Sequence, residues 1–527
     1  MNKFISVVSF ILLPTLMFSY SESYANLYEF CHSERSEARL PDGQESQSND
    51  LQEIWNDFAY SLHDTRLSDG QEKEVLQRSQ NVTITGIAEG QAGKLVRVIV
   101  YADQFSNLDH TIAQTHTDNS GKFFMQFDVD QTKFALLALG LDKGEFYLKP
   151  GTHYNFNILI DTVLGKGSIF DQLPLNFTVE TDDGGIQQSI GDFNMLYNDF
   201  IYNNINSIYK SKDKSVVTGF VQEMHEKYTD NKAIYVRDYV KYSLASLLWL
   251  SRKESNRQIL VNYFVNKPIL YKNIQYTDFF KEFFKSYFTS EKIYTYEELI
   301  LAINNSEPID IVDKLIARDE KLALDDRIRE IVEMLLLSRH YHNRDVKKQR
   351  VISKYNDIAN SSEFIENRLI ARNFITKLQE LQNGTKAPCF ILTNAKKDSI
   401  SLSDYAGKFV LLSFVKEDCS ICDFHMQLLN DIREQNGDKF DIVTIVAGDE
   451  FDRLVDFANE RGYKWSILKT NENILLLEAY NIRAYPSYVF INPDGTIAYA
   501  HLPMPDENME LYLQRFMSGY NEVETNK

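Results

Sequence analysis

The 527-residue chain is predicted to be a multi-domain protein with an N-terminal antiparallel β-sandwich, an all-α middle domain and a C-terminal α/β domain. Three changes in residue pattern carry this prediction. Residues 81–182 contain short β-rich runs separated by turn residues. Residues 183–382 repeat apolar side chains at steps of three and four, as amphipathic helices do. Residues 383–520 alternate strand-like and helix-like segments, which is typical of an α/β sheet.

Residues 1–25 have the features of a cleaved signal peptide. Lys3 precedes an apolar stretch that ends at Phe18, and Ser23 and Ala25 supply the small side chains that a signal peptidase recognises. The apolar stretch is shorter than the ~20 residues of a spanning helix; the alternative is an uncleaved membrane anchor. We therefore expect an exported protein of the periplasm or cell envelope, with no integral membrane segment after cleavage.

Residues 26–80 are predicted to be a weakly ordered linker because Ser, Glu, Gln and Asp dominate them. They contain the related peptides "RLPDGQE" and "RLSDGQE". Two copies of a seven-residue peptide are too short and too few for a repeat fold, so we interpret them as a duplicated linker segment.

The predicted β-sandwich is read from runs such as "KLVRVIVYA" and "HYNFNILID", with turn residues between them. No cluster of polar residues in 81–182 resembles an active site. This domain is therefore interpreted as a binding or spacer module.

The helical pattern of the middle domain is clear in "RIREIVEMLLLSRHYH" and in "FIENRLIARNFITKLQELQ". Tyr and Phe are unusually dense, as in "YTDFFKEFFKSYF". An aromatic stripe at helical spacing forms either a ligand groove or a core. We interpret this one as core, which is the commoner use of such a stripe.

The C-terminal domain begins a new pattern after residue 383. "KFVLLSFV" reads as a buried strand and "DFHMQLLNDIREQ" as the helix that follows it. "SYVFINPDGTIAYA" reads as a hairpin that turns at residues 492–495. Strands that alternate with helices in this way predict an α/β sheet.

The formal net charge of −19 limits the partners of the chain. Nucleic acids bind basic surfaces, so we expect no nucleic-acid partner. An anionic membrane surface is unfavourable for the same reason.

The chain has four cysteines, Cys31, Cys389, Cys419 and Cys422. An exported protein stapled by disulfides would carry more of them, spread along the chain. One close pair and two scattered cysteines favour redox chemistry instead.

Cys419 and Cys422 lie where the strand "KFVLLSFV" gives way to a helix. A helix N-terminus carries unpaired N–H groups and a partial positive charge, which stabilise a thiolate, the form of cysteine that attacks disulfides. A zinc site would need four ligands; His425 could be a third, but a fourth is missing. An inert structural disulfide would close a loop too small to add much stability.

Residues 383–520 resemble the thioredoxin fold and, within it, the exported TlpA/ResA-like thiol–disulfide oxidoreductases. The resemblance rests on "GTKAPCFIL", "LSDYAGKFVLLSFV", "CSIC" and "IRAYPSYVFINPDGTI", in that order. The whole layout is similar to multi-domain members with an N-terminal β domain and a helical region. The resemblance implies a C-terminal α/β thioredoxin-like domain.

The resemblance also implies roles for particular residues. Cys419 would attack a client disulfide and Cys422 would resolve the mixed disulfide. Pro486 would be cis and would expose the backbone of Tyr485 to an extended client segment. The implied partners are client proteins with disulfides and a membrane-bound electron donor, and no cofactor is implied.

Three positions depart from the family pattern. Asp418 stands where a tryptophan is usual before the first cysteine. Ser413 stands where many thioredoxins have a buried acid. His425 stands where the family has an alternative acid, on the same helical face as Cys422. His425 is therefore a candidate for proton transfer with Cys422; the alternative is a solvent-exposed histidine.

The charges near the motif indicate a direction of electron flow. Glu417, Asp418 and Asp423 disfavour a thiolate and raise the thiol pKa, and a less stable thiolate makes the disulfide a poorer oxidant. Lys416 and a protonated His425 act in the opposite sense. The balance favours a reductant or isomerase over a strong oxidant.

A redox-inactive thioredoxin-fold scaffold or binding protein of the cell envelope is the alternative function. The missing tryptophan and Ser413 favour it, whereas retention of both cysteines and of Pro486 argues against it. A peroxidase on the same fold would need a threonine three residues before the reactive cysteine, where this chain has Lys416.

Overall fold

The computed structural model describes residues 80–159, 174–210, 214–305, 310–416, 419–447, 451–470 and 473–525. The predicted signal peptide and almost all of the predicted linker lie outside these ranges. So do Glu417 and Asp418, which carried part of the charge argument. In the parts that the structure describes, no helix is both long and apolar enough to cross a membrane.

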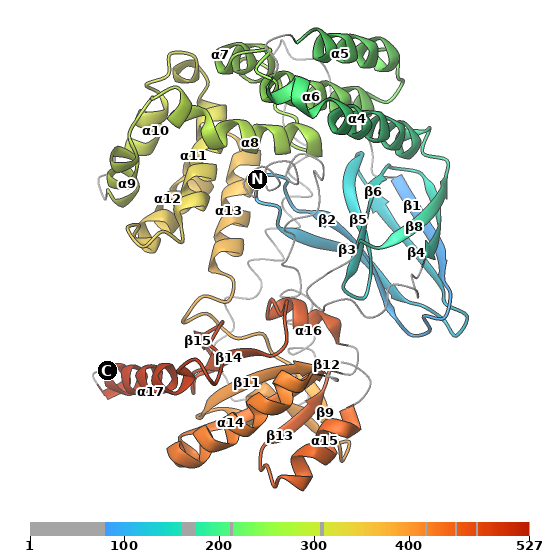
Figure 1. The fold of residues 1–527 in the computed structure, drawn as a ribbon. Helices are drawn as coiled ribbons and strands as arrows, with labels where there is room; N and C mark the ends of the chain where they lie inside the picture. Colours follow the sequence, from blue (N-terminus) through green and yellow to red (C-terminus); the bar gives the residue numbers. More distant parts are fainter. Residues whose placement is uncertain are drawn as a thin grey trace, which may run out of the picture.

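The N-terminal part consists of two four-stranded sheets, with strand orders β4-β1-β7-β8 and β3-β2-β5-β6 (Figure 1). Alternating burial along strands such as β7 gives each sheet one apolar face. Side chains from both sheets join one buried cluster. The strands are β1 Gln80–Ala88, β2 Leu95–Tyr101, β3 Asp109–His116, β4 Lys122–Val129, β5 Lys133–Leu139, β6 Asp142–Leu148, β7 His153–Leu159 and β8 Asn176–Thr181.

The prediction of a purely antiparallel arrangement is wrong for one strand pair. β1 and β7 run parallel, with Thr83 opposite His153 and Ala88 opposite Ile158. A hairpin forces two neighbouring strands to be antiparallel, but β1 and β7 are far apart in sequence. The long chain between them lets β7 run in the same direction as β1. The other pairs among β1–β8 are antiparallel.

The middle part is helical, as predicted, and the aromatic stripe on α8 is core. Phe279, Phe280, Phe283 and Phe284 are all buried in one cluster. The helical segments are α4 Ile186–Tyr209, α5 Ser215–Tyr228, α6 Ile234–Leu250, α7 Asn256–Ile259, η2 Leu260–Phe264, α8 Ile274–Ser290, α9 Tyr296–Asn304, α10 Ile311–Ile316, η3 Leu322–Leu324, α11 Asp326–His340, α12 Lys348–Ser361 and α13 Ile365–Gln379.

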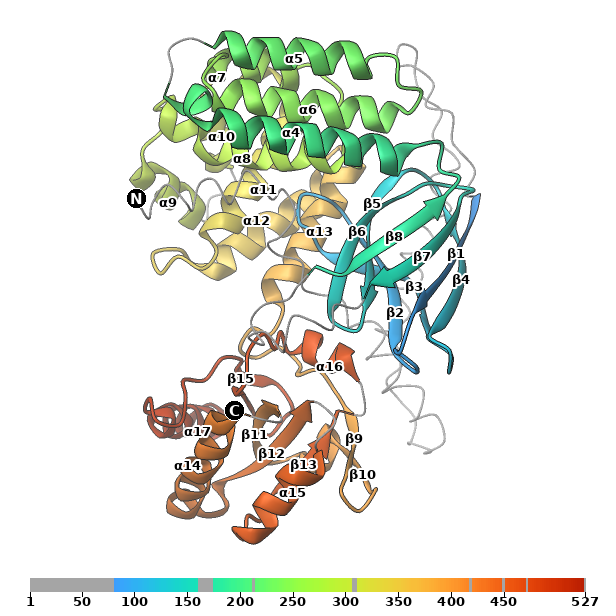
Figure 2. The ribbon, with the colours of Figure 1, turned by 45° about the vertical axis from the view of Figure 1, so that its right-hand side comes forward.

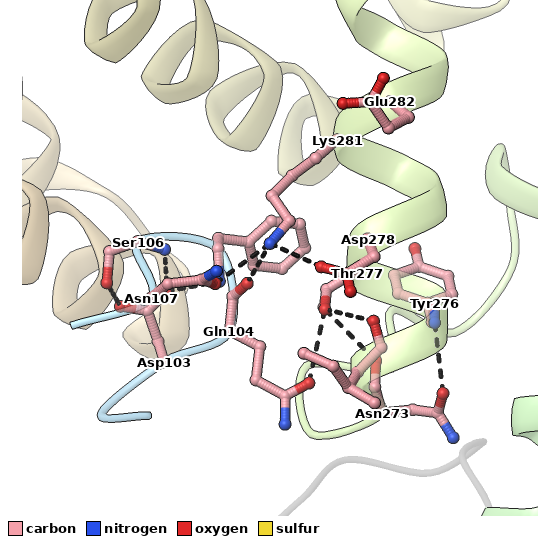
Figure 3. A network of polar contacts seen from close by, with 12 residues as sticks. Asp103, Gln104, Ser106, Asn107, Asn273, Tyr276, Thr277, Asp278, Lys281 and Glu282 are labelled. Atoms are coloured by element: carbon pink, nitrogen blue, oxygen red, sulfur yellow. Dashed lines mark hydrogen bonds and ion pairs between the residues drawn. The ribbon is translucent and has the colours of Figure 1, made fainter. Parts of the chain in front are cut away.

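The loop between β2 and β3 fastens the N-terminal sheets to the helices. Phe105 at its tip is buried in the helical core. Around it, Lys281 of α8 donates hydrogen bonds to the carbonyl oxygen of Gln104 and to Asn107 Oδ1, at 3.0 and 3.1 Å (Figure 3). An apolar anchor surrounded by charge-assisted hydrogen bonds holds the two parts together.

The C-terminal part is built on a seven-stranded sheet of order β10-β9-β13-β12-β11-β14-β15. α14, α15 and α17 pack on one face of the sheet, and α16 packs on the other (Figure 2). The elements are β9 Ile391–Asn394, β10 Ser399–Ser401, η4 Leu402–Tyr405, β11 Phe409–Lys416, α14 Ser420–Asn436, η5 Gly437–Lys439, β12 Phe440–Ala447, α15 Phe451–Glu460, β13 Ser466–Lys469, α16 Ile474–Ala479, β14 Ser487–Ile491, β15 Ile497–Tyr499 and α17 Met509–Thr525.

A buried ion pair joins this C-terminal sheet domain to the N-terminal sheets. Arg97 of β2 donates two hydrogen bonds to the carboxylate of Glu478 on α16, at 2.6 and 2.8 Å. The Arg97 side chain is 0% exposed and that of Glu478 is 3% exposed. Burial alone would raise the pKa of Glu478, but Arg97 and Lys143 hold that pKa below its ordinary value.

Candidate active site

The strand β11 precedes the cysteine motif, which therefore lies at the C-terminal end of a central strand of the sheet. Its residues are buried on both faces from Phe409 to Val415. It lies between β12, which is parallel to it, and β14, which is antiparallel. A continuous apolar run suits such a central position, which explains why "KFVLLSFV" forms it.

Cys419 occupies the N-cap of α14, and Cys422 lies in the first turn of the helix. The backbone N–H of Cys422 donates a hydrogen bond to Cys419 Sγ at 3.2 Å. In the reduced protein, this donor and the helix N-terminus would stabilise a thiolate on Cys419. The placement at a strand–helix junction is the one that the sequence predicted.

The two cysteines form a disulfide with an S–S distance of 2.06 Å. Cys419 is 8% exposed, whereas Cys422 is 0% exposed. An external thiol therefore has access to Cys419 Sγ before Cys422 Sγ. Cys389, which the sequence did not pair, is disulfide-bonded as well.

The loop before β14 lies against the cysteine pair. The Tyr485–Pro486 peptide bond is cis, as the resemblance implied. Tyr485 packs against the buried cluster that contains both cysteines, and burial raises the pKa of its phenol to about 12. Within the described ranges, the backbone of Tyr485 makes no hydrogen bond to other backbone groups.

His425 lies three residues after Cys422 on α14 and is buried, with 1% of its surface exposed, so the alternative of a solvent-exposed histidine is wrong. Its Nδ1 lies 3.1 Å from the hydroxyl of Tyr488, and its Nε2 lies 3.4 Å from Asp506 Oδ1. Burial lowers the pKa of His425, and Asp506 and Glu507 only partly oppose that effect. His425 is therefore neutral near pH 7 and able to accept a proton.

Ser413 of β11 lies directly opposite Tyr488 of β14, where the two strands pair. Its side chain is fully buried. A serine cannot titrate at this position, where the resemblance would place an acid. His425 is therefore the ionisable residue of α14 that lies on the same helical face as Cys422.

The charge argument for a reductant is weakened by one contact. Arg453 of α15 lies 3.2 Å from a carboxylate oxygen of Asp423, and both side chains are partly exposed. The paired arginine offsets the negative charge of Asp423 near the motif. The lowered pKa of His425 acts in the other direction, because it removes a positive charge that opposed the argument.

Sequence reasoning missed four residues around the motif. Tyr488 follows Pro486 by two positions, and the period of a strand could have placed it on the same face of the sheet as Ser413. Asp506 lies in a loop and gave no signal. Ile421 and Phe424 gave none either, although both are half exposed on the first turns of α14.

Comparisons with known proteins find similarity in the C-terminal part of the chain. Residues 383–500 match the model of the AhpC/TSA family. The chain is 30% identical over 131 residues to thiol-disulfide oxidoreductase ResA of Geobacillus kaustophilus, which covers 24% of this chain and 74% of that protein. It is 25% identical over 146 residues to ResA of Bacillus thuringiensis, covering 27% and 84%.

Solved structures are also similar to part of the chain. The thioredoxin domain of a thiol-disulfide oxidoreductase from Bacteroides vulgatus is 24% identical, with 26% of this chain and 98% of that chain covered and a TM-score of 0.24. A thioredoxin-like protein from Bacteroides caccae is 16% identical, with 45% and 92% covered and a TM-score of 0.29.

Proposed function

We propose, from the premise that this chain belongs through its C-terminal domain to the ResA-like thiol–disulfide oxidoreductases, that it exchanges disulfides with client proteins. Cys419 and Cys422 are the redox pair. One observation carries the proposal. Cys419 is at the N-cap of α14, forms a disulfide with Cys422, and accepts a hydrogen bond at Sγ from the backbone N–H of Cys422. The first sulfur is thus activated and the second is within reach of it.

In the reducing direction, the Cys419 thiolate attacks a sulfur of the client disulfide and displaces the other client sulfur as a thiolate. The Cys422 thiol then loses its proton and attacks Cys419 Sγ. The mixed disulfide breaks, the client leaves with both sulfurs reduced, and the Cys419–Cys422 disulfide forms. The client gains two electrons and the pair loses two.

Tyr485 and Pro486 form the client-binding segment in this proposal. The backbone of Tyr485 makes no hydrogen bond to another described backbone group, which supports pairing with an extended client strand. Ile421 and Phe424 are half exposed beside Cys419 and would contact apolar side chains of the client.

The wider setting belongs to the proposal as well. The protein would be exported to the periplasm or cell envelope, with a reductant or isomerase role and a membrane-bound electron donor. The N-terminal sheets, which share one apolar core, would form a β-sandwich over residues 81–182. Residues 183–382 would form the helical domain and residues 383–520 the thioredoxin-like domain.

The reduction potential of the Cys419–Cys422 pair tests this function. We would equilibrate the full chain in glutathione buffers and use Cys422→Ser to trap mixed disulfides on Cys419. A potential near the roughly −270 mV of thioredoxin, with trapped clients, supports a reductant. A potential near roughly −120 mV reverses the direction. A pair that cannot be reduced, or that traps nothing, supports the redox-inactive scaffold instead.

A further inference from the structure

A small cluster of buried polar side chains lies on the face of the C-terminal sheet that α14 covers. Ser413, His425 and Tyr488 are each exposed by 2% or less. Within the described ranges, Ser413 Oγ and His425 Nε2 have no hydrogen-bond partner of good geometry. Buried polar atoms are nearly always paired, so a buried cluster whose contacts to Tyr488 and Asp506 are this long or poorly aligned requires an explanation.

The histidine of this cluster connects the interior with the surface. On its inner side, Nδ1 lies 3.1 Å from the hydroxyl of Tyr488. On its outer side, Nε2 lies 3.4 Å from Asp506, whose side chain is 51% exposed. The imidazole therefore spans the gap between a buried hydroxyl and a carboxylate in contact with solvent.

Cys422 needs such a connection because its sulfur is closed to water. It is 0% exposed, and it lies three residues before His425 on α14, on the same helical face. A thiol at this position cannot pass its proton directly to bulk solvent. The proton has to travel through side chains before Cys422 can attack.

We propose that Asp506 and Tyr488 are positioning residues that hold His425 so that it carries the proton of Cys422 to solvent. This inference rests on the proposed function. The Tyr488 hydroxyl donates to Nδ1, and the ring proton sits on Nε2 opposite the Asp506 carboxylate. When Nδ1 takes the proton of Cys422, the Tyr488 hydroxyl turns from donor to acceptor and receives the new Nδ1–H bond, while the proton on Nε2 leaves through Asp506 to water. The Cys422 thiolate then displaces the client sulfur from Cys419, and the reverse reaction returns the proton.

The charges around His425 are suited to this role. Asp506 and Glu507 face it from the loop before α17, and Tyr488 faces it from β14. The carboxylates stabilise the imidazolium that forms in passing, while burial keeps the resting ring neutral. Removal of the Asp506 charge would lower the pKa of His425 further.

The test separates the two steps of exchange. The reduced full-length protein is mixed with an aromatic disulfide that releases a coloured thiolate. The first equivalent reports the attack by Cys419, and the second reports the attack by Cys422 on the mixed disulfide. The variants are Asp506→Asn and His425→Gln. The control is Asp431→Asn, which removes the same charge from an exposed position on α14.

We expect the first phase to be unchanged in both variants. The second phase should slow on the order of 10²-fold in His425→Gln, as for loss of a general acid–base group. It should slow about two- to fivefold in Asp506→Asn, as for loss of a partly exposed ion pair. The acid limb of its pH profile should move to lower pH in Asp506→Asn and disappear in His425→Gln. Asp431→Asn should match the wild type.

Two results would overturn the inference. A second phase as fast as wild type in Asp506→Asn, or one slowed equally at every pH, would leave Asp506 with only a structural role. Because Asp506 lies on an exposed loop, this variant gives an answer even if His425→Gln fails to fold. A wild-type chain that releases no thiolate at all would overturn the proposed function together with the relay.

Discussion

Removal of the Arg97 guanidinium would leave the buried Glu478 carboxylate with Lys143, which lies further away, as its neighbouring cation. Lys143 Nζ lies 3.7 Å from that carboxylate, whereas Arg97 makes two short hydrogen bonds to it. Truncation of one partner of a buried pair costs about 3–5 kcal/mol, because the other charge stays in the interior. We expect Arg97→Met to lie near the lower end, about 3 kcal/mol, since Lys143 compensates in part.

Hydrogen exchange of α16 measures this cost where it arises, as the free energy of opening. The double variant Arg97→Met/Glu478→Leu should recover most of the loss, because no charge is left unpaired. The control is Arg318→Met, which breaks an exposed pair with Glu298 and should cost about 1 kcal/mol or less. A cost below about 1 kcal/mol for Arg97→Met would refute the reasoning.

The same ion pair gives a pH dependence. The pKa of Glu478 is lower in the folded protein than its ordinary value of 4.5. Its contribution to stability is therefore complete above pH 4.5 and is lost as the pH falls through the folded-state pKa. The exchange of α16 should speed up at acid pH in the wild type, and this acceleration should be absent from the double variant.

Three further variants test other parts of the structure. Phe105→Ala should lower the free energy of unfolding, measured in urea, by about 3–5 kcal/mol, because it leaves a cavity in the helical core. A loss below about 1 kcal/mol would contradict that packing. Gly86→Ala should lower the free energy of unfolding by about 1–3 kcal/mol and so lower the melting temperature, because a Cβ would lie 2.4 Å from the Phe123 ring. An unchanged melting temperature would contradict this crowding. Cys419→Ser should abolish the release of coloured thiolate while the circular dichroism spectrum stays unchanged; residual turnover would show that Cys422 can attack first.

Local patterns were sufficient to predict the elements around the redox pair. The run of apolar residues into Cys419 and the helix after it follow from composition and periodicity, and so does their junction. The cis bond at Pro486 came from the resemblance, because an X–Pro bond by itself is cis in only about 5–6% of cases. These features depend on residues close together in sequence.

The remaining features depend on residues far apart in sequence. A helical pattern places His425 on the face of Cys422, but its burial comes from Tyr488 and from the loop of Asp506, more than sixty residues further on. The parallel pairing of β1 with β7 escaped prediction because strand patterns do not specify partners. Arg97 gave no sign that it would be buried, since its partner Glu478 belongs to another part of the chain.

The alternation of side chains along β11 separates two tasks of the C-terminal domain. Val410, Leu412 and Phe414 point to the face covered by α16, the helix pinned to the N-terminal sheets through its carboxylate. Leu411 and Val415 point to the face of α14 and the cysteines. Attachment and chemistry thus draw on opposite faces of one strand. Substitutions at the even positions would alter the attachment of the C-terminal domain to the N-terminal sheets. Substitutions at the odd positions would tune the reactivity of the cysteines. Each property can therefore evolve without the other.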